Sequence, residues 1–214
     1  IVILEVVLGG ILDSTNVIDC PEAAVITNIG LEHTEYLGTT YAEIAKNKAG
    51  IIKPGCECVL YDGNEDVKRV VTDTCKENNA NLTIADFADI IPVSQSLEGQ
   101  SFIYKGERYE TALIGKHQLY NSAVVLETVN VLRKKGRSIP DSAVKEGLKQ
   151  VKWPARMEIL SQNPLFILDG GHNPQCASAL QESLTELFPG QKVIFLAGIL
   201  KDKSYDKVTE ILKP

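Results

Sequence analysis

Short apolar runs that end at glycines or ionisable side chains are the feature of this sequence that most limits its fold. Three such runs begin at Ile1, Ala23 and Cys56, and segments with helical spacing follow the second and the third. A continuous apolar run bounded by turn residues is typical of a buried strand. Buried strands that alternate with helices form parallel sheets covered on both faces. The sequence therefore predicts an α/β fold.

The expected elements can be placed from the same pattern. We expect strands over 1–7, 23–28, 56–61 and 81–85. Thr40 and Glu43 match a capping box and predict a helix that ends near Ala49. The segment SFIYKGERYETAL predicts a hairpin with Lys105-Gly106 at its tip, as an antiparallel excursion on the parallel sheet. Further helices are expected over the ranges 67–78, 119–135 and 141–150.

The pattern breaks around Trp153, where we expect a linker over 153–163. A second α/β unit then begins, with strands over 165–168 and 192–197. Helices are expected to start at Pro174 and to cover 205–212. This order predicts a second, Rossmann-like domain.

Composition excludes several classes of protein. The chain has 214 residues, of which 44% are hydrophobic, enough for a core. Its net charge of -6 and the lack of a Lys/Arg cluster argue against binding nucleic acid or a membrane surface. The five cysteines include no CxxC pair and are expected to be reduced, as in a cytoplasmic protein. No apolar run approaches the roughly 18 residues of a membrane span.

Glu5, His33 and Lys48 are candidate site residues because they follow strand ends or close a helix. The Glu5 carboxylate is a suitable ligand for Mg²⁺. His33 can be a metal ligand or a structural residue that only makes hydrogen bonds. Lys48 can simply complement the helix dipole. The cluster Asp13-Ser14-Thr15-Asn16 suits either a cap or turn or a polar substrate.

Six ordered motifs then carry a family resemblance that spans nearly the whole chain. EVVLGGILDSTN, from Glu5 to Asn16, resembles the motif E-x-G-x-G-G-x-x-D-[AS]-T-N of dihydrofolate synthase/folylpolyglutamate synthases. The other five are similar to later motifs of that family, in the right order: IGLEHTEYLG, IAKNKAGIIKP, GKHQLYN, WPARME and DGGHNP. Val7, Glu32 and Ala155 depart from the usual glycine, aspartate and glycine.

The resemblance implies a Mur-ligase fold. Residues 1–152 would be a P-loop-NTPase-like central domain, mostly parallel with an antiparallel hairpin, and 164–214 the start of a truncated Rossmann-like glutamate-ligase domain. The sequence contains no GxxxxGK[ST] phosphate loop. We therefore expect an internal fragment that begins after this loop and is inactive by itself.

The implied activity is ATP-dependent addition of L-glutamate to dihydropteroate or to the γ-carboxyl of folates, through an acyl phosphate. The resemblance implies two Mg²⁺ sites, with Glu5, His33 and a carboxylated Lys48 as ligands. Lys48, His33 and His172 would be catalytic. The implied ATP contacts are Asn121, Arg156 and Asp169, and the implied pteroate contacts are Leu12, Asp13 and Ser14.

Other interpretations stay open. Asn121 also suits a helix cap, Arg156 a surface charge, and His172 a hydrogen bond within a turn. A peptidoglycan Mur ligase would share the ATP and metal chemistry, and a non-catalytic fragment would bind nucleotide or folate without turnover. We expect a cytoplasmic monomer whose partners are folate or dihydropteroate, L-glutamate and ATP, with no nucleic acid or membrane partner.

Overall fold

The computed structural model describes residues 1–200 and 205–213. Two compact units divide the chain: the first consists of Ile1–Phe87 and Ala123–Ile139, and the second of Ala88–Ser122 and Pro140–Pro214. Helix α4 (Lys116–Lys134) begins in the second unit and ends in the first. These two units do not correspond to the domains expected over 1–152 and 164–214. The expected linker over 153–163 stays a prediction.

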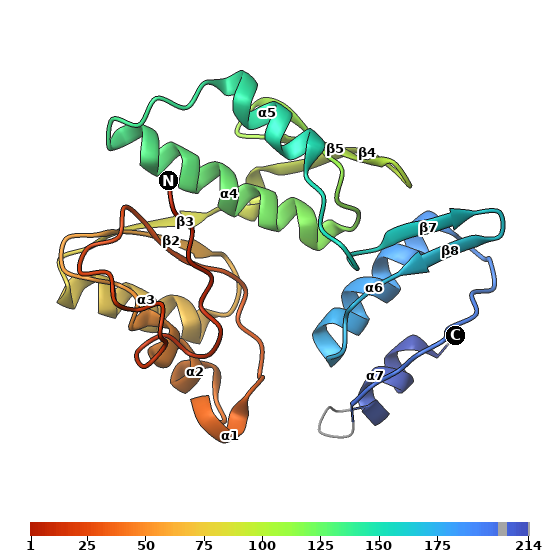
Figure 1. Cartoon of the computed structure of the whole chain (residues 1–214), viewed down its shortest axis with the longest axis horizontal. Coiled ribbons are helices and arrows are strands. Elements are labelled where there is room, and N and C mark those ends of the chain that lie inside the picture. Colours follow the sequence, from red (N-terminus) through yellow and green to blue (C-terminus); the bar gives the residue numbers. More distant parts are fainter. Residues whose placement is uncertain (201–204, 214) are drawn as a thin grey trace. The chain divides into compact units, whose positions relative to one another are not determined.

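A parallel sheet forms the centre of the first unit. Its strands are β1 (Ala24–Ile26), β2 (Glu57–Tyr61) and β3 (Asn81–Ala85), in the order β1-β2-β3. Figure 1 labels β2 and β3 side by side. Three of the four strands expected in this region are therefore confirmed. The central strand β2 is almost entirely buried, as a continuous apolar run in a parallel sheet should be.

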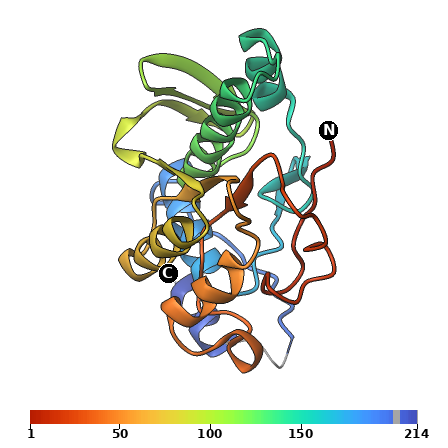
Figure 2. The ribbon, with the colours of Figure 1, turned by 90° about the vertical axis from the view of Figure 1, so that its left-hand side faces the viewer.

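Three helices accompany this sheet: α1 (Thr34–Leu37), α2 (Tyr41–Ala49) and α3 (Glu65–Glu77). The capping box of α2 is confirmed, because the Thr40 hydroxyl accepts from the Glu43 N–H and the Glu43 carboxylate accepts from the Thr40 N–H. Helices α2 and α3 pack against each other, as both ribbon views indicate (Figures 1 and 2). Their buried faces, with the sheet, make the core of this unit.

The predicted strand over 1–7 is wrong. This segment has no regular secondary structure, and Ile1, Val2 and Ile3 are 103%, 81% and 90% exposed. Among the described residues, the parallel sheet contains only β1, β2 and β3. A strand needs a neighbour for its backbone N–H and C=O groups, and an apolar run alone does not provide one.

The second unit contains an antiparallel sheet of β4 (Ile90–Ser96), β5 (Gly99–Tyr104) and β6 (Glu107–Thr111), which follow a short 3₁₀ helix, η1 (Phe87–Asp89). The hairpin tip at Lys105-Gly106 is confirmed, and both residues have the positive φ of a tight hairpin turn. The expected placement of the hairpin was wrong, since these strands form a separate sheet. Helix α5 (Asp141–Gln150) packs against β6.

The last segment of the second unit is a hairpin with two helices. β7 (Glu158–Gln162) and β8 (Leu165–Leu168) pair antiparallel, so part of the expected linker is a strand. Helix α6 (Pro174–Leu187) has the expected proline in its first turn and is capped by the Asn173 side chain. Helix α7 (Tyr205–Leu212) is also confirmed and packs against α6.

The predicted strand over 192–197 is wrong. Residues 191–200 have no regular secondary structure, and Ile194 and Leu196 are 96% and 93% exposed. Among the described residues, β7 and β8 pair only with each other, so this apolar run has no strand beside it. Its pattern marks a strand in sequence, but pairing decides whether one forms.

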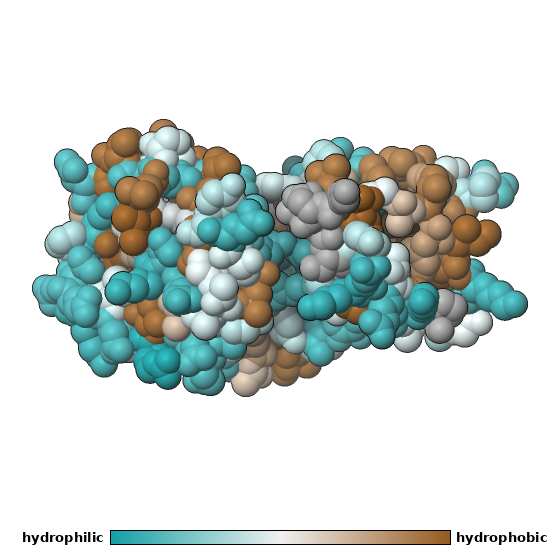
Figure 3. All heavy atoms as spheres, turned by 90° about the horizontal axis from the view of Figure 1, so that it is seen from below, coloured by the Kyte–Doolittle hydropathy of each residue, from teal (hydrophilic) through white to brown (hydrophobic). Residues whose placement is uncertain are grey.

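The surface mixes polar and apolar side chains. Figure 3 shows hydrophobic residues (brown) among hydrophilic ones on the face that it draws. Large exposed hydrophobic side chains occur along the chain, Leu12, Ile194 and Leu196 among them. Within the described residues, every helix is too short or too polar to cross a lipid bilayer.

Candidate functional site

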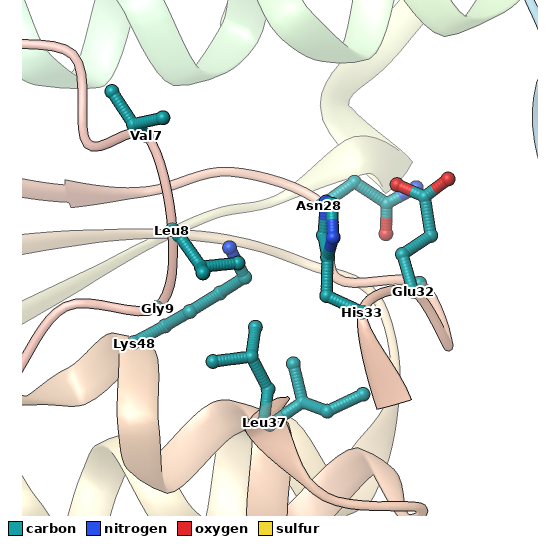
Figure 4. Close-up of a pocket in the computed structure, with 10 residues that line it drawn as sticks. Val7, Leu8, Gly9, Asn28, Glu32, His33, Leu37 and Lys48 are labelled. Carbon is teal, nitrogen blue, oxygen red and sulfur yellow. The ribbon is translucent and has the colours of Figure 1, made fainter. Parts of the chain in front are cut away.

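A pocket of about 200 Å³ lies in the first unit, beyond the carboxyl end of β1. Three segments line it: Val7–Gly9, the loop that contains Asn28, Glu32 and His33, and the α1–α2 region with Leu37, Ile44 and Lys48 (Figure 4). Ligands of open α/β sheets bind at this end of the strands. Two of the predicted site residues, His33 and Lys48, therefore line one pocket.

The backbone at His33 explains how its ring reaches the pocket. His33 is the N-cap residue of α1 and has the left-handed conformation, with φ 51° and ψ 36°. Its carbonyl accepts hydrogen bonds from the N–H groups of Tyr36 and Leu37, both at 2.9 Å. Such a conformation is uncommon for a residue other than glycine and is found at functional sites. The first turn of α1 thus fixes the residue that presents the imidazole.

Lys48 reaches the pocket from the last turn of α2. The side chain is half-buried, and in Figure 4 its ammonium lies near Leu8, on the side of the pocket that faces the His33 ring. Helix α2 is held firmly, because its start carries the capping box and its Ile44, Ala45 and Ala49 side chains are buried. Because this helix is well packed, the backbone from which the Lys48 side chain extends is held in place.

Glu5, the third predicted metal ligand, does not line this pocket. It is exposed, in the irregular segment that was expected to be a strand. Asn28 and Glu32 line the pocket instead, although neither is among the site residues expected from the sequence. The signal was available: both stand between the end of β1 and His33, where ligand-binding side chains gather in this kind of sheet.

The pocket fits a divalent cation only in part. Glu32 and Asn28 offer oxygens, which Mg²⁺ prefers, and His33 offers an imidazole. The ammonium of Lys48 repels a cation as it stands. No cluster of three His, Cys, Asp or Glu side chains suited to a metal ion occurs in the part of the chain that the structure describes.

The predicted pteroate-binding turn separates into two kinds of residue. Leu12 is 96% exposed and Ser14 is exposed. The Asp13 carboxylate, in contrast, accepts hydrogen bonds from the N–H groups of Val7 and Leu8, at 3.0 and 2.9 Å, and from the N–H and hydroxyl of Thr15. These bonds, that of Leu8 first, lower the pKa of Asp13 to about 2.

The predicted nucleotide residues lie in the second unit. The Asp169 carboxylate accepts from the N–H groups of Met157 (3.0 Å) and Gly171 (2.8 Å). Gly170 donates its N–H to the carbonyl of Ala155 at 2.8 Å, and Arg156 donates to the same carbonyl. These bonds bring the WPARME and DGGHNP motifs side by side, with Arg156 exposed.

His172 and Asn121 are both exposed in the second unit. The Nδ1 atom of His172 lies 3.2 Å from the carbonyl of Gly170, the hydrogen bond expected of a histidine in a turn. Asn121 lies on α4 and donates to the Gln118 side chain at 3.0 Å. Each residue therefore makes a local hydrogen bond and is exposed.

His117 is a half-buried titratable residue that is not among the site residues expected from the sequence. Its Nε2 atom lies 3.1 Å from the Gln118 side-chain nitrogen. Because that amide nitrogen can only donate, the imidazole Nε2 accepts and Nδ1 carries the proton. Nδ1 is buried without a hydrogen-bond partner. Burial lowers the pKa of His117, against the opposing charges of Asp169 and Glu182.

Two family models match the chain. The Mur ligase middle domain matches residues 1–129, and the Mur ligase glutamate ligase domain matches residues 155–213. The chain is 35% identical over 219 residues to a dihydrofolate synthase/folylpolyglutamate synthase of Bacillus subtilis, a match that covers 99% of this chain and 51% of that protein. The chain thus spans about half the length of the curated relatives it matches.

Solved structures agree with the sequence matches. A complex of folylpolyglutamate synthase with AMPPCP and folate superposes with a TM-score of 0.87 and 34% identity, over 98% of this chain and 52% of that one. A Mycobacterium tuberculosis folylpolyglutamate synthase with ADP superposes with a TM-score of 0.84 and 30% identity, over 97% and 48%. The chain belongs to the Mur ligase family, and its similarity to dihydrofolate synthase/folylpolyglutamate synthases confirms the resemblance carried by its motifs.

Proposed function

We propose that this protein is an ATP-dependent amide ligase that adds L-glutamate to dihydropteroate, to the γ-carboxyl of folates, or to both. The observation that carries the proposal is the superposition on a folylpolyglutamate synthase bound to AMPPCP and folate. AMPPCP is an analogue of ATP. The related synthase therefore holds a nucleotide and folate in the same complex, which supports both as ligands of this protein. The cytoplasm is the expected location, and all five cysteines are free thiols.

The proposed reaction has two steps. A carboxylate oxygen of the substrate attacks the γ-phosphorus of ATP, ADP leaves, and an acyl phosphate forms. The amino group of L-glutamate then attacks the acyl carbon, phosphate leaves, and the nitrogen loses a proton. Arg156 is suited to the phosphate charge because its guanidinium is exposed and always protonated. Asp169 fixes the backbone around Arg156 through its bonds to Met157 and Gly171.

Lys48 would enter this chemistry as a carboxylated side chain. Its neutral amine adds CO₂ to give a carbamate and release a proton, which replaces a cation by a carboxylate-like oxygen ligand. The modified Lys48 and His33, which line one pocket, would then hold Mg²⁺, with Glu5 as a further predicted ligand. Mg²⁺ would supply charge neutralisation at the phosphates.

Incubation of the full-length protein with ATP and isotopically labelled L-glutamate tests the activity. We expect label in folate or in the dihydropteroate product, and none in a UDP-muramoyl substrate. Label only in the muramoyl product would assign the protein to peptidoglycan synthesis, and label in neither would refute the ligase.

The role of Lys48 has its own test. Intact-mass measurement in bicarbonate should show an added mass of about 44 Da, that of CO₂. Lys48→Ala should abolish this addition, and Lys46→Ala should retain it. Lys46 is the matched control, since it is an exposed lysine of the same helix. In a Mg²⁺ titration, Lys48→Ala should lower the affinity for Mg²⁺, and Lys46→Ala should not. Equal behaviour of the two variants would contradict the carboxylation.

A further inference from the structure

The residues on both sides of Arg156 have a strained backbone. Ala155 and Met157 have φ angles of 55° and 47°, in the left-handed region that residues other than glycine rarely adopt. A strained conformation of this kind persists only where the surrounding structure holds it, and it is found at functional sites. The contacts that hold this turn therefore bear on the role of the residue between them.

Two carboxylates hold the turn, one on each side of Arg156. The Glu158 Oε2 atom accepts the N–H of Ala155 at 2.8 Å. The Asp169 Oδ2 atom accepts the N–H of Met157 at 3.0 Å. Both carboxylates come from the hairpin of β7 and β8 (Figure 1), in which Glu158 pairs with the residue that precedes Asp169. The hairpin register therefore brings the two acceptors to the same turn.

The guanidinium of Arg156 stays outside these two hydrogen bonds. In the part of the chain that the structure describes, neither Glu158 nor Asp169 forms an ion pair with it. Its Nη1 atom donates to the Ala155 carbonyl at 3.1 Å and lies 3.1 Å from the position of a Cβ built at Gly170. A carboxylate paired with a guanidinium would compete with an anionic ligand for the same donors. The arrangement leaves the charge of Arg156 available to an anion.

We propose that Glu158 is a positioning residue for Arg156. Its hydrogen bond to the Ala155 N–H fixes the backbone from which the guanidinium extends, and directs the carboxylate away from that guanidinium. The identity of the anion as a nucleotide phosphate rests on the proposed function, whereas the positioning does not. Glutamine could replace Glu158 in this bond because its amide oxygen also accepts, but aspartate is one methylene shorter. The role thus depends on reach and on an acceptor, and not on charge.

Amide hydrogen exchange of the full-length protein without ligands tests the positioning. The exchange rate of the Ala155 N–H, measured by mass spectrometry of fragmented peptides, reports whether the Glu158 bond is made. Glu158→Asp should raise this rate severalfold, and Glu158→Gln should leave it near that of the wild type. Glu186→Asp shortens an exposed glutamate of α6 and is the matched control, with no expected change. An unchanged rate in Glu158→Asp, or an equal rise in both Glu158 variants, would overturn the proposal.

Affinity for AMPPCP gives the second readout. Glu158→Asp should weaken binding severalfold, and Glu158→Gln should retain it. In the background of Arg156→Ala, Glu158→Asp should weaken binding no further, because a residue that acts through Arg156 has no effect once the guanidinium is gone. Additive losses in the double variant would show that Glu158 acts independently of Arg156, which contradicts the positioning role.

The two readouts separate this proposal from the proposed function. A wild-type protein that does not bind AMPPCP would refute the nucleotide site, and hydrogen exchange at Ala155 would still decide the role of Glu158. If Glu158→Asp does not fold, Glu158→Gln decides by itself. Wild-type exchange at Ala155 in that variant supports the proposal, and a severalfold rise overturns it, because the acceptor oxygen is retained.

Discussion

Gly10 lies directly against the backbone of Lys48. A Cβ built at Gly10 would come within 2.8 Å of the Lys48 carbonyl oxygen and 2.6 Å of the Asn47 carbonyl oxygen. Gly50 meets Ile11 in the same way from the other side. This paired close approach, rather than an unusual φ at Gly10, explains why glycine occupies the turn at this point.

We expect Gly10→Ala to lower the free energy of unfolding by about 1–3 kcal/mol, because the added methyl group meets backbone atoms that cannot rotate away. Chemical denaturation measures the change. Gly147→Ala is the matched control: Gly147 is exposed within α5 and no atom lies near its Cβ position, so that variant should gain up to about 1 kcal/mol. A neutral Gly10→Ala would show that the turn is not packed on α2.

The capping box of α2 should contribute measurably to stability. Thr40→Ala removes the hydroxyl that accepts from the Glu43 N–H and should cost about 1 kcal/mol. Thr39→Ala leaves that bond intact and should have a smaller effect on urea denaturation. Equal losses in the two variants would contradict the assignment of Thr40 as the cap.

Asp13 should make the free energy of unfolding depend on pH in the acidic range. Its pKa is about 2 in the folded protein, below the ordinary value of 3.8, so the folded state favours the ionised carboxylate. Its contribution is complete above about pH 4 and is lost as pH falls toward 2. The difference in unfolding free energy between the wild type and Asp13→Asn should shrink over this range. A constant difference would refute the hydrogen-bonded carboxylate.

His117 should destabilise the protein below neutral pH. Burial lowers its pKa from the ordinary 6.5, so the unfolded chain takes up the proton first. Stability is full above about pH 6.5 and falls as pH decreases toward the folded-state pKa. His117→Asn, compared with the wild type at pH 8 and pH 5.5 by thermal unfolding, should show a weaker pH dependence. An unchanged slope would mean that His117 is solvated.

The elements that sequence predicted well are those specified locally. Thr40 and Glu43 mark the start of α2, Lys105-Gly106 marks a hairpin tip, and Pro174 follows the cap of α6; each acts through neighbours a few residues away. The runs 1–7 and 192–197 have equally clear strand patterns, yet neither forms a strand. Strand formation depends on a distant partner, which a local pattern does not specify.

The sequence by itself determined the family and the α/β class, because those follow from ordered motifs and from short-range periodicity. It also pointed to His33 and Lys48, which line one pocket. Only the tertiary structure decided which of the chemically suitable side chains meet. It placed Asn28 and Glu32 beside His33, left Glu5 exposed, and turned the Asp13 carboxylate onto its own backbone. The physical reason is that side-chain direction is set by packing and long-range hydrogen bonds, such as that of Ile11 to Asn47, which join residues far apart in the chain.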